Sequence, residues 1–168
     1  MIEINKDLQI IQSVGIEAFD YITTIPETQR KKGGDEGGVH IMLRILWMKG
    51  MVHVLVNLPS PLAHDYAVEK SVRTEIMEDV TSQDSEDTDI FHYRGCVSYK
   101  LPDGTIIHCA VSGLFGTEDV TIAIIVMAKK LGVTVDDVIN NIKQRSGSLP
   151  EEIFQEGHYL KVLLDTYR

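Results

Sequence analysis

An alternation of apolar and polar side chains over residues 39–48 constrains the fold of this chain more than any other sequence feature. Because successive side chains of a β-strand point to opposite faces, the alternation predicts a strand with one apolar face. Lys49-Gly50 then suits a two-residue turn into a second strand. The resulting hairpin pairs Leu43 with Val56 and has one wholly apolar face.

A second hairpin is predicted around Pro102-Asp103-Gly104. Proline fixes φ at about −65°, which suits a type I turn. We therefore expect a three-residue loop that closes on Leu101 and Thr105, with Gly104 left-handed. The same register places Cys96 and Cys109 on opposite faces of the hairpin, where they cannot form a disulfide.

Apolar periodicity and capping residues predict helices before, between and after the hairpins. Ser60-Pro61 begins the helix between them, and its buried stripe is expected at Val68, Val72 and Ile76. Thr117 is expected to cap a helix that is apolar nearly all round and therefore buried.

Together these elements predict an α+β fold in which a central antiparallel sheet, built from two β-hairpins, carries helices on both faces. The chain is expected to form a single domain over residues 1–168. Residues 133–168 are predicted to be a helical extension packed on it, with its last helix opening at Pro150.

The charge balance narrows the classes of partner. The chain has 16 basic and 25 acidic side chains and a formal net charge of −9 at pH 7, and its one dense basic patch is Arg30-Lys31-Lys32. Because this surface repels phosphate backbones and anionic lipids, neither nucleic acid nor a membrane is expected as a partner. No membrane helix or signal peptide is predicted, and two reduced cysteines favour a cytoplasmic location.

The six histidines lack the spacing of common metal motifs, since no His-Glu-x-x-His or Cys-x-x-Cys occurs. His40 and His53 share the polar face of the first hairpin, but the predicted register places His53 opposite Leu46. Two independent imidazoles are favoured there over a joint metal site, and no metal site is predicted. His64, which precedes Asp65, is expected on the exposed side of its helix.

His108 is predicted to lie in mid-strand beside Ser98. A hydrogen-bonded strand histidine is favoured there over a metal or haem ligand, although imidazole serves both roles. The acidic residues 81–89 are interpreted as an exposed loop rather than a cation site, because they lack the glycine and the distal glutamate of a calcium loop.

Two short segments resemble a known family. Residues 67–74, Ala-Val-Glu-Lys-Ser-Val-Arg-Thr, resemble the Ala-x-x-Lys-Ala/Ser-x-x-Thr helix of the small haem-binding (GlcG/HbpS-like) family. Residues 110–114, Ala-Val-Ser-Gly-Leu, followed by an acidic helix start, resemble its Val-Ser-Gly turn. The order of elements also matches over roughly residues 5–131. The chain departs from the family at Val120, where some relatives have histidine.

The resemblance implies a profilin-like fold, homo-oligomers and the binding of haem or another small molecule. A pocket between the Lys70 helix and the Ser112-Gly113 turn would hold this ligand. Those motifs, together with His108 nearby on its strand, give the candidate ligand-binding residues Lys70, Thr74, His108, Ser112, Gly113 and Asp119.

Three hypotheses for the function follow. The first is a small-ligand-binding domain without demonstrated catalysis, with haem as one candidate cofactor. The second is a structural or interaction protein whose homo-oligomer contacts use Leu160, Leu163 and Leu164 of the C-terminal helices. The third is an enzyme that uses Asp119 and His108 as acid and base.

Overall fold

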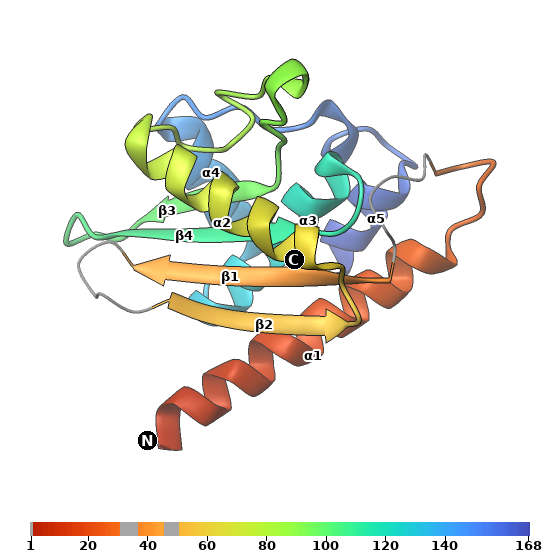
Figure 1. Ribbon diagram of the computed structural model, residues 1–168, viewed down its shortest axis with the longest axis horizontal. Helices are drawn as coiled ribbons and strands as arrows, with labels where there is room; N and C mark the ends of the chain where they lie inside the picture. Colours follow the sequence, from red (N-terminus) through yellow and green to blue (C-terminus); the bar gives the residue numbers. More distant parts are fainter. Residues whose placement is uncertain (1, 31–36, 46–50) are drawn as a thin grey trace.

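The computed structural model of the chain describes residues 2–30, 37–45 and 51–168, and its centre is one antiparallel sheet (Figure 1). Four strands lie in the order β2-β1-β4-β3. Their bounds are β1 Gly38–Ile45, β2 Met51–Asn57, β3 Cys96–Lys100 and β4 Ile106–Ser112. The predicted α+β fold, with one sheet made from two hairpins, is confirmed.

Helices cover both faces of this sheet (Figure 1). α1 (Ile2–Thr24) and α3 (Gly116–Leu131) contact each other and lie on one face, whereas α2 (Pro61–Ile76) lies on the other. α4 (Val135–Gln144) contacts α3 and β3, and α5 (Tyr159–Thr166) contacts α1 and α3. No helix in the described part of the chain is both long and apolar enough to cross a membrane.

The C-terminal elements contribute to the same apolar core as the sheet. After Pro150 the chain makes only a 3-10 turn (Glu151–Ile153), so the predicted helix start there is wrong, and His158 caps α5 instead. The apolar side chains of α5 that were expected to form an oligomer surface are between 0% and 2% exposed and belong to the core: Leu160, Leu163 and Leu164. These three leucines therefore cannot form an interface while the protein stays folded.

The second hairpin has the predicted register. Leu101 and Thr105 close the loop through an N–H···O bond of 2.8 Å, and Gly104 has a φ of +91°. Val97 lies opposite Cys109, and the two cysteines face different clusters of the core as free thiols. The prediction succeeded because proline and glycine fix the loop conformation locally.

The first hairpin differs from its predicted register. Leu43 pairs with Val52 rather than Val56, and His53 pairs with Met42 rather than Leu46. The described strands end at Ile45 and resume at Met51, so the expected turn at Lys49-Gly50 lies outside the described residues. The two strands are shifted by an even number of residues, which keeps the same side chains on the apolar face.

The buried face of α2 is not the one that its apolar residues predict. Ile76 is 72% exposed, and Val68 and Val72 are only partly buried. The fully packed positions are instead small or polar: Ala63, Ala67, Lys70, Ser71, Arg73 and Thr74. Small side chains let the helix approach the sheet closely, and Lys70, Arg73 and Thr74 have partners inside the protein, as described below. The buried Ser71 hydroxyl has no hydrogen-bond partner among the described residues.

Candidate functional site

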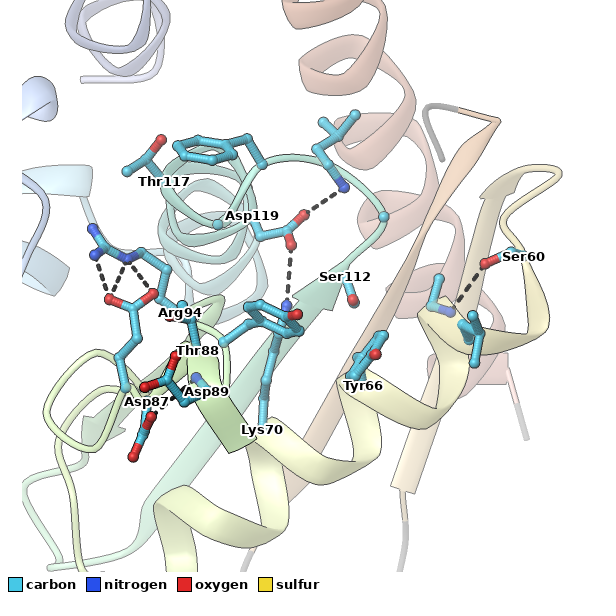
Figure 2. A pocket seen from close by; sticks show the side chains of 18 of the residues that line it. Ser60, Tyr66, Lys70, Asp87, Thr88, Asp89, Arg94, Ser112, Thr117 and Asp119 are labelled. Carbon is cyan, nitrogen blue, oxygen red and sulfur yellow. Dashed lines mark hydrogen bonds and ion pairs between the residues drawn. The ribbon is translucent and has the colours of Figure 1, made fainter. Parts of the chain in front are cut away.

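A pocket of about 1000 Å³ lies between the N-terminal half of α2, the β4–α3 turn and the segment that precedes β3 (Figure 2). Its wall combines aromatic, hydroxyl and charged side chains. The described lining residues are Ser60, Leu62, Ala63, Tyr66, Lys70, Glu86, Asp87, Thr88, Asp89, Tyr93, Arg94, Ser112, Gly113, Leu114, Phe115, Gly116, Thr117, Asp119 and Glu152.

A buried ion pair joins two walls of this pocket. Lys70 of α2 donates to Asp119 of α3 over 3.0 Å and to the Val111 carbonyl over 2.9 Å, as Figure 2 shows for the first contact. Asp119 also accepts the Leu114 N–H. Both side chains are 2% exposed. Burial raises the pKa of Asp119, and the Lys70 ammonium opposes this effect by favouring the carboxylate.

Two glycines with positive φ let the backbone lie close to its neighbours around this ion pair. Gly95 has a φ of +139°, and a Cβ there would lie 2.6 Å from the Lys70 ammonium nitrogen. Gly113 has a φ of +142°, and a Cβ there would lie 2.2 Å from the Gly38 carbonyl oxygen. Any larger residue at either position would collide with its neighbours, so the Ser112-Gly113 turn needs its glycine.

Two arginines fix the acidic segment that forms the opposite wall. Arg73 of α2 donates to the carbonyls of Ser82, Ser85 and Tyr93, and Arg94 forms a bidentate pair with Glu86. The segment therefore has a defined conformation rather than that of a freely exposed loop.

Two of the acidic side chains in this segment already have partners. The Asp84 carboxylate accepts three backbone N–H groups, from Val80, Thr81 and Ser148, and Glu86 is paired with Arg94. These bonds use the oxygens that a cation would need, so the structure gives the cation-site alternative no support.

A second buried ion pair lies beside the first. Glu118 forms a bidentate pair with Arg30 at 2.5 and 3.0 Å and accepts a hydrogen bond from the Tyr159 hydroxyl at 2.8 Å. The same carboxylate accepts the Phe115 N–H, so α3 is capped by its own Glu118 and not by Thr117.

The predicted basic patch is not a surface feature at Arg30, because this side chain is only 5% exposed. Lys31 and Lys32 lie outside the described residues.

The structure brings four of the six candidate residues to the pocket: Lys70, Ser112, Gly113 and Asp119. Thr74 is fully buried beneath α2, where its hydroxyl donates to the Lys70 carbonyl. Sequence reasoning missed Tyr66, Tyr93 and Arg94. No motif marks those three. Tyr93 and Arg94 take their places from the path of the segment before β3, whereas Tyr66 lies on α2 and contacts Tyr93.

His108 is not among the described residues that line the pocket. It pairs with Ser98 in the register, as expected, and lies four residues before Ser112, roughly 13 Å along the strand. Burial and the nearby Arg44 and Arg145 lower its pKa to about 4. Neither ring nitrogen has a hydrogen-bond partner within the described part of the chain. The described residues therefore give no support to the favoured interpretation as a hydrogen-bonded histidine.

The pocket is acidic overall. Among its described lining residues, five side chains are carboxylates and two are cations, and both cations are already paired with carboxylates. Asp87, Asp89 and Glu152 remain as negative charges without a paired cation in the lining. Such a wall attracts cationic and hydroxyl-bearing groups and repels anions.

Searches against protein-family models, curated proteins and solved structures found no match for this chain.

Proposed function

We propose that the protein is a small-ligand-binding domain whose ligand occupies the pocket between α2 and the β4–α3 turn. One observation carries the proposal: Lys70 and Asp119, which are 49 residues apart, meet as a buried ion pair in the wall of a cavity of about 1000 Å³. A buried ion pair adds little to stability compared with apolar side chains, so its place beside a cavity favours a role in binding.

The lining favours a ligand with an aromatic part and a cationic or hydroxyl-bearing part. Tyr66 and Tyr93 contact each other edge to face, with ring centroids 5.3 Å apart, and Phe115 adds a third ring to the wall. Asp87 and Asp89 supply negative charge near these rings. An aromatic amine satisfies both features, because its ring stacks on the phenols and its ammonium meets the carboxylates.

Haem stays a prediction of the family resemblance, and the pocket gives it limited support. Among the described lining residues, Tyr66 and Tyr93 are the side chains of a type that ligates haem iron, and neither histidine nor cysteine is present. The two propionates of haem would also meet an acidic wall. If haemin binds here, we expect its Soret band to be unaffected by His108→Ala.

The charge preference of the pocket can be tested with a matched pair of probes. Tyramine and 4-hydroxyphenylacetate share a phenol ring but carry opposite charges. We expect tyramine to shift the ¹H–¹⁵N resonances of Gly113, Gly116 and Thr117 in a saturable way, and the acid to leave them in place. Asp89→Asn should weaken the tyramine effect, because it removes one carboxylate from the lining.

Asp136→Asn is the matched control, since this exposed aspartate lies on α4 and is not among the residues that line the pocket. It should leave the tyramine shifts unchanged. If both probes bind equally, or if neither moves the pocket resonances at millimolar concentration, the proposed ligand class is wrong.

A further inference from the structure

Three histidines from three different elements meet on the α2 side of the sheet. His40 lies on β1, His53 on the edge strand β2 and His64 in the first turns of α2. One ring nitrogen from each lies within 4.8 Å of the others, and His40 Nε2 is 2.8 Å from His53 Nδ1. The ring centroids are 4.8 to 5.5 Å apart.

His40 is the buried member of this cluster. It is 3% exposed, and its Nε2 faces His53. Burial and the neighbouring imidazoles lower the pKa of His40 to about 4 and also lower that of His53.

A carboxylate is placed to orient the third ring. Asp65 Oδ1 lies 3.1 Å from His64 Nδ1. A proton on Nδ1 held by this carboxylate leaves the lone pair on Nε2. Metal-ligating histidines commonly donate their second ring N–H to a carboxylate in this way.

We propose that His40, His53 and His64 bind one divalent transition-metal ion, with zinc as the reference ion. Imidazole nitrogens suit zinc, and three histidines plus a water complete a tetrahedral shell. Zn–N distances of about 2.0–2.1 Å place ligand nitrogens about 3.3 Å apart. The closest pair of ligand nitrogens, now 2.8 Å apart, must therefore separate by about half an ångström. A pair at the 4.8 Å limit must close by about 1.5 Å.

The surroundings allow these movements. His53 and His64 are exposed, so their rings can turn towards an ion while His40 stays fixed in the sheet. Their exposure also leaves room for a water as the fourth ligand. The proposed site adjoins the pocket, because His40 pairs with Ser112 across β1 and β4, but it shares none of the described lining residues. It is therefore independent of the proposed ligand.

Calorimetric titration of the EDTA-treated, full-length protein with zinc chloride alone tests this site. We expect one zinc ion per chain. His53→Gln and His64→Gln should each weaken binding by at least about tenfold, and Asp65→Asn by about 10–100-fold. Cobalt(II) provides a second readout, because a tetrahedral site gives intense visible ligand-field bands that His53→Gln should abolish.

His92→Gln is the matched control, since this partly exposed histidine is not in the cluster. Both ligand variants replace exposed side chains, so circular dichroism should find them folded. The proposal is overturned if the wild type binds no zinc. It is equally overturned if His53→Gln and His64→Gln bind zinc as tightly as His92→Gln does.

Discussion

Lys70 illustrates how much a single residue can depend on a distant partner. We expect Lys70→Met to lower the free energy of unfolding by about 3–5 kcal/mol, because it leaves the Asp119 carboxylate buried without its cation. Urea unfolding at pH 7 measures this loss. The double variant Lys70→Met/Asp119→Leu should recover much of it, since an apolar pair removes the uncompensated charge.

Lys100→Met is the control for Lys70, because Lys100 is exposed on β3 and its replacement should change stability by less than about 0.5 kcal/mol. Equal losses for the two single variants would contradict the role of the ion pair. So would a double variant that is less stable than Lys70→Met alone.

His108 gives the protein a predicted dependence of stability on pH. Its folded-state pKa is about 4, compared with 6.5 when unperturbed, so the unfolded state binds more protons between these values. The contribution of His108 to the free energy of unfolding is fully present above pH 6.5 and is lost as the pH falls towards 4. The expected loss from this residue is roughly 3 kcal/mol, from 1.36 kcal/mol per pKa unit.

Urea unfolding at pH 7.5, 5.5 and 4.5 measures this loss, and His108→Gln should flatten the profile. His158→Gln serves as the comparison, because that histidine lies at the start of α5, outside the sheet. An unchanged slope in His108→Gln would show that other groups cause the acid sensitivity.

The apolar pattern of α2 predicts that Ile76 is buried and sensitive to substitution. The structure predicts the reverse, with Ala67 as the sensitive position and Ile76 as the tolerant one. We expect Ile76→Ser to cost less than about 0.5 kcal/mol, because Ile76 is 72% exposed. Ala67→Leu should cost about 1–3 kcal/mol, because Ala67 has no exposed surface and packs against Met42 and Ala110 of the sheet. Chemical unfolding of the two variants checks the order, and the reverse order would contradict the observed orientation of α2.

The elements also indicate what the sequence could and could not predict. Local chemistry determined the second hairpin, because Pro102 and Gly104 select one loop. The orientation of α2 was missed because the rule that apolar residues face inward fails when a buried lysine has its carboxylate 49 residues away. The histidine cluster was missed because His64 reaches it from another element and the register of the first hairpin was wrong.

The C-terminal helix α5 should stabilise the core of the protein. Leu160 has no exposed surface, so Leu160→Ala is expected to lower the free energy of unfolding by about 2–5 kcal/mol. Val162→Ala, at a position 43% exposed, should cost much less. Urea unfolding compares the two variants. Equal small losses would contradict the observed packing of α5.

Homo-oligomer formation stays a prediction, and the three leucines of α5 no longer support it because they are buried. Light scattering at micromolar concentration would measure the mass of the particle directly. If a dimer forms, we expect Leu160→Ala to leave its mass unchanged in native buffer, because Leu160 lies in the core of each chain.

The first turn of α3 has a consequence for how the chain folds. Neighbouring residues Glu118 and Asp119 reach partners 88, 49 and 41 residues away in sequence: Arg30, Lys70 and Tyr159. Each contact closes a long loop, whose entropy must be lost before the contact stabilises the fold, and such non-local topologies fold slowly. During synthesis, this turn cannot reach its final environment until Tyr159 has left the ribosome, which makes the pocket a late product of folding.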